Sequence, residues 1–294
     1  MSPLIPLRAR SIDLLNLVIG KASNFLLTAI LFAIASQGRD AMAFSDFGYW
    51  WSVGIMVGGV FLGGMNSAAV RTVIISSSLL PALRLSRQLV VVMLLAGMLI
   101  SIILVQTGVA LLDQVLLIAV VSAFGIGVML QSLVFGLLRA LEASLSNTIA
   151  SSLVVFLVPT LTWLLSGPNP DLTRLFGALT AAFSISTAIC IAIAWPSFRY
   201  LLNRDSLDVS DNRRILRDAL AFTAINIFSY AAVNVDFTLI KRLGTEDEFV
   251  LLANAKVYFE RFVLPALMVF AGAISLRVLR HPQQDPAGVA RIHA

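Results

Sequence analysis

"VLLIAVVSAFGIGVMLQSLVFGLL", residues Val115–Leu138, carries no ionisable side chain along its whole length. An α-helix rises 1.5 Å per residue, so a segment of this length reaches across a bilayer core about 30 Å thick. Polar and apolar side chains do not alternate along it, as they would in a strand of a membrane barrel. The segment therefore predicts a transmembrane helix.

The composition of the chain extends this prediction to most of its length. The 294 residues are 59% hydrophobic and 13% charged, with a mean hydropathy of +0.91, whereas soluble domains are about 25% charged. We expect an all-α polytopic membrane protein of about eight transmembrane helices. The predicted spans are Ile12–Ala35, Gly48–Ala69, Leu89–Leu112, Val115–Leu138, Leu145–Leu165, Leu172–Trp195, Ala219–Leu243 and Phe249–Leu276.

The positions of the arginines predict the orientation in the membrane. Most of them flank the ends of the spans that share a side with the N-terminus, and cytoplasmic loops retain Lys and Arg. We therefore expect a multi-pass protein of the bacterial inner membrane with a cytoplasmic N-terminus. The net charge of +5 is then topological, and we expect no nucleic-acid partner because no basic face with interleaved aromatic residues is present.

The first apolar stretch has a second interpretation as a cleaved signal peptide. Arg8 and Arg10 precede it, and "AIAS" at Ala33–Ser36 resembles a cleavage site. Lys21 interrupts the apolar run, however, and the run is long enough to span the bilayer. A retained first helix is therefore the preferred interpretation.

A polar, arginine-rich segment divides the predicted spans into six and two. "DNRRILRDAL" in this divider, residues 211–220, opens with helix-capping residues and predicts an amphipathic lead-in helix on the inner surface. The predicted units are a six-helix lobe (1–198), a cytoplasmic linker with the amphipathic helix (199–218), the first two helices of a second lobe (219–280) and a polar tail (281–294).

The second predicted span carries glycines at four-residue intervals, Gly54 with Gly58 and Gly59 with Gly63. Small residues at this spacing let a neighbouring helix backbone approach closely in lipid. Trp50 and Trp51 lie at its outer end, where amphipathic rings collect at the membrane surface. We predict a tightly packed helix with both tryptophans as interface anchors.

Polar and charged side chains recur inside three of the predicted spans. Each charge at the middle of a membrane costs about 2.5–3.5 kcal/mol or more, so these groups are expected to face protein or water. Two alternatives remain open: local ion pairs such as Lys256–Glu260 and Asp236 with Lys21 or Arg261, or a substrate or ion pathway. The residues concerned are Lys21 and Asn24 in the first span, Asn226, Asn234 and Asp236 in the seventh, and Lys256, Glu260 and Arg261 in the eighth.

The three cations among them would form a positively charged interior if their helices converge. Lys21, Lys256 and Arg261 would then suit phosphate or pyrophosphate, since Arg binds these groups in bidentate fashion. We expect no enzyme and no cofactor, because the sequence carries no Ser/His/Asp set and no phosphate-binding glycine loop. We also expect no metal site, because the two histidines lack ligand spacing.

Four stretches give the sequence its resemblance to a known family: "SDFGYWWSV" (Ser45–Val53), "QSLVFGLLRALEASLSNTIASSL" (Gln131–Leu153), "NVDFTLIKRLGTEDEF" (Asn234–Phe249) and "AKVYFERFVLPALMVFAGAISLRVLR" (Ala255–Arg280). In their order and spacing they resemble the polysaccharide-export branch of the multidrug/oligosaccharidyl-lipid/polysaccharide exporter superfamily. The resemblance implies two six-helix lobes that rock around a central cavity, whose cations attract the pyrophosphate-sugar head group of an undecaprenyl-linked glycan.

The resemblance also implies roles for the polar residues within the spans. Lys21, Lys256 and Arg261 would bind the head group, whereas Asp236 and Glu260 would tune these cations or carry a coupling ion. The three asparagines would line the cavity. The partners would be the lipid-linked glycan, a precursor of a surface polysaccharide such as O-antigen, lipopolysaccharide or exopolysaccharide, and the membrane lipid.

The chain departs from the family pattern because only two helices of the second lobe are predicted. We expect a C-terminally truncated family member, with a second chain as the open alternative for the missing helices. The functional alternatives are a cation-coupled drug or metabolite exporter that uses Asp236, and a non-transporting remnant. A membrane-embedded glycan polymerase or ligase would need a large periplasmic loop, and the predicted outer loops are short.

Overall fold

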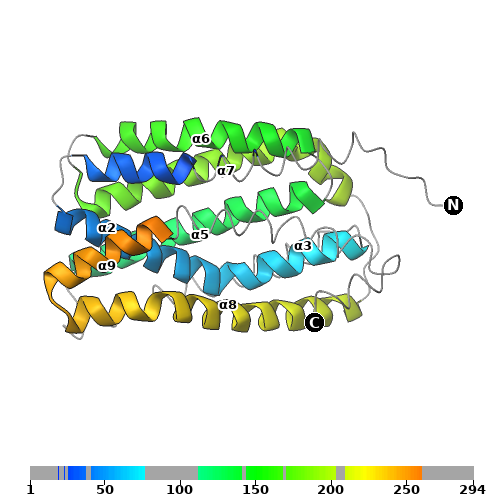
Figure 1. The fold of residues 1–294 in the computed structure, drawn as a ribbon. Coiled ribbons are helices and arrows are strands. Elements are labelled where there is room, and N and C mark those ends of the chain that lie inside the picture. The colour runs from blue at the N-terminus through cyan, green and yellow to red at the C-terminus, as the bar shows by residue number, and fades with distance from the viewer. Residues whose placement is uncertain are drawn as a thin grey trace.

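The computed structural model describes residues 19, 23, 26–37, 41–76, 112–140, 144–167, 170–202 and 209–259. These residues are almost entirely helical (Figure 1). Beside an unlabelled helical stretch that includes Leu26–Ser36, the elements are α2 (Ala41–Gly58), the π-helix η1 (Gly59–Gly63), α3 (Gly64–Ser76), α5 (Leu112–Ala140), α6 (Ser144–Ser166), α7 (Leu172–Leu202), α8 (Val209–Leu243) and α9 (Glu246–Tyr258).

Three helices are long and apolar enough to cross a membrane, within the part of the chain that the structure describes. They cover Leu112–Leu138, Ser146–Ser166 and Leu172–Pro196, and each agrees with a predicted span to within a few residues. The structure thus supports a helical membrane protein. The count of about eight spans stays a prediction.

A ladder of aromatic rings forms the core between α2, α5 and α7. Phe47 of α2 stacks on Phe176 of α7 at 5.4 Å between ring centroids, and Trp51 lies 4.7 Å from Phe124 of α5. Trp51 is only 5% exposed, so its predicted role as an interface anchor is wrong. Neighbouring residues on a helix point about 100° apart, and here Trp51 turns into the core.

The second predicted span consists of α2, η1 and α3 in succession. On α2, Gly54 and Gly58 meet Gly125 of α5 so closely that a Cβ at Gly125 would overlap the Gly54 carbonyl oxygen. The predicted glycine-mediated packing is therefore present. The π-helix at Gly59–Gly63, which the sequence analysis did not predict, interrupts the regular helix in the middle of this span.

The long helix α8 packs along α3 and η1, on the opposite side of the second span from the aromatic core. It is continuous from Val209 to Leu243, so it includes both the predicted lead-in helix and the predicted seventh span. It touches α2 only sparsely. A short turn then reverses the chain into α9, which returns along α2 (Figure 1).

Candidate functional site

The structure describes only part of the predicted cavity. Lys21, Asn24, Glu260 and Arg261 lie outside the described residues. The backbones of Asn234 and Asp236 belong to α8, but their side chains are likewise outside the description. The convergence of the three cations on one hollow therefore stays a prediction.

Lys256 and Asn226 are the two predicted site residues whose side chains the structure describes. Lys256 is half-buried in the last turn of α9. Asn226 is half-buried on α8, and its amide nitrogen donates a hydrogen bond of 3.4 Å to the carbonyl oxygen of Gly59. A Cβ at Gly63 would lie 2.5 Å from the same nitrogen. Asn226 thus spans the two ends of η1.

Contact between Asn226 and η1 has a physical reason. In a π-helical turn each N–H donates to the carbonyl oxygen five residues earlier, instead of four as in an α-helix, and such turns occur frequently at functional sites. A backbone carbonyl in an apolar environment needs a donor, because an unpaired one costs free energy. The amide of Asn226 supplies a donor at the first residue of η1.

Polar and aromatic contacts come together where α2, α8 and α9 meet. The ammonium nitrogen of Lys241 on α8 lies 2.5 Å from a carboxylate oxygen of Asp46 on α2. It also lies over three rings, at 4.0 Å from the centroid of Tyr49, 5.1 Å from Phe249 and 5.9 Å from Trp50. We call these five residues the Lys241 cluster.

Each contact in the Lys241 cluster adds a modest amount of stability. A partly exposed ion pair contributes about 0–1 kcal/mol, and a cation over an aromatic face adds roughly 0.5–2 kcal/mol. The side chains of Lys241 and Asp46 are 28% and 31% exposed, so water can reach both. Water can therefore replace the charged contacts of the cluster, whereas Phe249 is buried against Tyr49.

Sequence reasoning missed the Lys241 cluster, although a signal for part of it was present. Asp46 precedes Tyr49 and Trp50 by three and four residues, which places all three on one face of a helix. An acid with two rings on one face predicts a site for a cation. The identity of the cation as Lys241 follows only from the fold.

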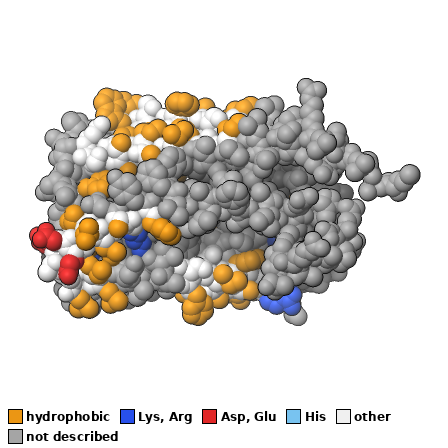
Figure 2. Space-filling view, viewed as in Figure 1, with side chains coloured by type: hydrophobic (Ala, Val, Ile, Leu, Met, Phe, Trp, Pro, Cys, Tyr) orange, Lys and Arg blue, Asp and Glu red, His pale blue; other side chains and the backbone are white. Residues whose placement is uncertain are grey.

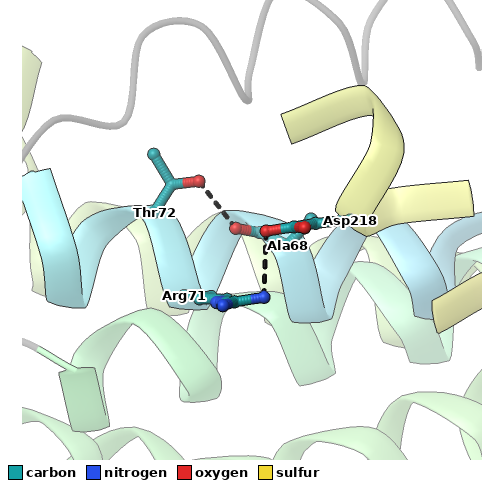
Figure 3. A network of polar contacts seen from close by, with 4 residues as sticks. All are labelled: Ala68, Arg71, Thr72 and Asp218. Carbon is teal, nitrogen blue, oxygen red and sulfur yellow. Dashed lines mark hydrogen bonds and ion pairs between the residues drawn. The ribbon is translucent and has the colours of Figure 1, made fainter. Parts of the chain in front are cut away.

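A second ion pair joins the second span to α8 at the opposite end of the bundle. A guanidinium nitrogen of Arg71 on α3 lies 3.0 Å from a carboxylate oxygen of Asp218 on α8. Figure 3 shows this pair beside the hydroxyl of Thr72, which donates a 2.8 Å hydrogen bond to the carbonyl oxygen of Ala68. The Arg71 side chain is 49% exposed, so the pair lies at the surface.

The two ion pairs are separated by about the thickness of a bilayer core. From Asp46 to Arg71 the second span covers roughly 37 Å, and from Asp218 to Lys241 α8 covers roughly 34 Å, at 1.5 Å per residue. The hydrocarbon core is about 30 Å thick. The start of the second span pairs with the end of α8, and the end of the span pairs with the start of α8, so the two run antiparallel. Acidic side chains also gather at the α8–α9 turn (Figure 2).

Comparison with known proteins identifies no relative. No family model, no curated protein and no solved structure matches the chain. The residues that the structure describes contain no group of three or more His, Cys, Asp or Glu side chains that could hold a metal ion.

Proposed function

We propose that the chain is part of a transporter that flips an undecaprenyl-linked oligosaccharide across the bacterial inner membrane by alternating access. Lys21, Lys256 and Arg261 bind the pyrophosphate head group in this proposal. Asp236 and Glu260 adjust the charge of the pathway or carry a coupling ion. The proposal includes no catalytic step and no cofactor.

One structural observation carries the proposal: the α8–α9 hairpin is not part of the aromatic core. The core joins the helix at Leu26–Ser36 to α2, α3, α5, α6 and α7. The hairpin joins this unit through close contacts of small residues with η1 and α3, through Asn226, through the two ion pairs, and through Phe249 of α9, which packs against Tyr49 of α2. Such a separable unit supports two bundle parts that move against each other, as alternating access requires.

The proposal is tested by the substitution Arg261→Ala. In a host that depends on this gene for its surface polysaccharide, the variant is expected to abolish the surface glycan while insertion in the membrane stays normal. Arg261→Lys should restore part of the function, since a cation remains but bidentate binding of phosphate is lost. Unchanged surface glycan in Arg261→Ala would refute the assignment of this residue.

The matched control is Arg217→Ala, which removes an exposed arginine of α8. It should leave the glycan unchanged because this side chain is exposed and lies near the opposite end of α8 from Asp236. A second arm replaces Asp236 with Asn and measures uptake or export of organic cations. Loss of cation export with normal surface glycan would favour the exporter of drugs or metabolites over the glycan flippase.

A further inference from the structure

We propose that α8 and α9 form a lever that pivots where α8 crosses η1 and α3, and that the Lys241 cluster is the latch that holds its far end against α2. The motion would open one end of the bundle only. It rests on the proposed transport for its purpose, but it is a property of the helices that can be measured without any substrate.

The pivot is placed by the close approach of two backbones. A Cβ at Gly64 would lie 2.5 Å from the carbonyl oxygen of Ala219 and 2.6 Å from the backbone nitrogen of Thr223. Met65 beside this contact is 1% exposed, and it packs in one apolar cluster with Ala219 and Ile215. No solvent molecule can replace these contacts, so this part of α8 stays in place.

Beyond the pivot, the described contacts between α8 and α2 are few. α8 contacts η1 and α3 extensively but α2 only sparsely, and Lys241 pairs there with Asp46. The hairpin meets α2 mainly through α9, whose Phe249 packs against Tyr49. Lys241 lies about fifteen residues beyond Asn226, or roughly 22 Å along the helix. A small rotation at the pivot therefore moves Lys241 much further than it moves the residues near Asn226.

The partners of Lys241 divide between the moving and the fixed part. Asp46, Tyr49 and Trp50 belong to α2, whereas Phe249 belongs to α9 and would move with Lys241. Opening would replace the ion pair and two ring contacts with water and would separate the buried Phe249 from Tyr49 of α2, while Lys241 would keep its contact with Phe249. The ion pair contributes little to the free-energy cost of opening, because exposed ion pairs gain little over hydrated charges. The exposure of Phe249 contributes the larger part of that cost.

The Arg71–Asp218 pair lies on the pivot side of the lever. Asp218 directly precedes Ala219, which contacts Gly64, so the backbone packing holds this pair in position. The two ion pairs thus have different roles despite their similar chemistry. Breaking the pair at Lys241 should release the lever, whereas breaking the pair at Arg71 should not.

Distances between spin labels on the full chain in lipid nanodiscs test the lever. In a background with Cys190 replaced by Ala, one label pair at Leu112 and Leu243 reports on the latch end, and a second pair at Arg199 and Arg217 reports on the pivot end. All four labelled side chains are exposed. Leu112 lies at the latch end because α5 runs parallel to the second span, with Val121 at Gly54 and Met129 at Asn66.

The test compares three substitutions. Lys241→Met keeps the length of the side chain without its charge, and should raise the ratio of long to short distances in the first label pair about tenfold. Asp46→Asn should act in the same direction by a smaller factor, and serves as the second variant if Lys241→Met does not give a monodisperse protein. Arg71→Met, the matched control, should change neither label pair.

Two outcomes would overturn the proposal. Equal changes in both label pairs would show that the hairpin separates as a whole, and unchanged distances in Lys241→Met and Asp46→Asn would show that the cluster is not a latch. These distances do not depend on the cargo. If Arg261→Ala leaves the surface glycan intact while Lys241→Met opens the latch end, the assignment of Arg261 in the transport proposal fails and the lever stands.

Discussion

The amide nitrogen of Asn226 lies 3.4 Å from the carbonyl oxygen of Gly59, which joins the middle of α8 to the first residue of the π-helix. The bond connects residues that are 167 positions apart in the sequence. It is a side-chain hydrogen bond between α8 and the second span that lies between the two terminal ion pairs. Its partner is a backbone carbonyl of η1, so the bond stabilises both the packing of α8 on the second span and the π-helical turn.

Substitution of Asn226 by Ala should destabilise the protein by about 1 kcal/mol, because the Gly59 carbonyl loses its donor and the bond is long. The measurement is the thermal unfolding midpoint in detergent, followed by circular dichroism. Ser229→Ala on an exposed part of α8 is the control and should stay within about 0.5 kcal/mol. Equal midpoints for the two variants would contradict the role of Asn226.

Gly125→Ala should destabilise the bundle by about 1–3 kcal/mol or more, the usual cost of overpacking. The new methyl group would overlap the Gly54 carbonyl oxygen, and a backbone atom cannot rotate away as a side chain can. Gly127→Ala on the same helix is the matched control, since its Cβ would lie 3.5 Å from the Cβ of Phe183, an ordinary contact. The prediction fails if both variants unfold at the same temperature.

Ser186→Ala should cost about 1–3 kcal/mol, because it leaves the buried amide of Gln131 without its partner. The Gln131 amide donates a 3.0 Å hydrogen bond to the Ser186 hydroxyl, and both residues are buried. Ser184→Ala removes an exposed hydroxyl of the same helix, and its effect should be small. Thermal midpoints of the purified variants separate the two cases, and a neutral Ser186→Ala would show that Gln131 finds another partner.

The hydrogen bonds between Thr245 and Glu248 at the start of α9 predict that the stability of the protein depends on pH. The Thr245 backbone N–H donates to the Glu248 carboxylate at 2.8 Å, and the Glu248 N–H donates to the Thr245 hydroxyl oxygen at 3.3 Å. These bonds favour the charged carboxylate, with the backbone bond as the larger cause, and so hold the pKa of Glu248 below its ordinary value. A lowered pKa stabilises the folded state at pH values above the ordinary pKa of Glu, near 4.3. This stabilisation disappears as the pH falls through the lowered pKa.

The difference in thermal midpoint between the wild type and Glu248→Gln should therefore be constant at neutral pH and shrink below about pH 4.3. Thr245→Ala, which removes the hydroxyl of the cap, should destabilise α9 by about 1 kcal/mol at neutral pH. A difference between wild type and Glu248→Gln that stays the same from neutral to acidic pH would exclude the predicted linkage.

Local properties of single segments were predictable from the sequence. The apolar segments at Leu112–Leu138, Ser146–Ser166 and Leu172–Pro196 were predicted to within a few residues, because hydropathy and length depend only on the segment itself. The glycine spacing in α2 likewise predicted close helix packing, because a missing side chain permits it whatever the partner. The sequence did not show that the partner is Gly125.

The candidate site was predictable only in part. Asn226 was selected because a polar side chain in an apolar segment needs a partner, and the structure gives it one on the backbone of η1. Trp50 and Trp51 looked equivalent as neighbours, but one joins the Lys241 cluster and the other joins the aromatic core. This choice depends on the rotation of α2 about its axis, which its neighbours fix.

The sequence by itself determined that this is a helical, strongly apolar chain with charges where they cost free energy, because composition and hydropathy are sums over local residues. Only the tertiary structure decided that Lys241 meets Asp46, which is 195 positions away, and that Arg71 meets Asp218. Such pairs depend on the axial position and crossing of α2, α3 and α8. Close packing of small residues in the middle of these helices sets that geometry, and no single segment encodes it.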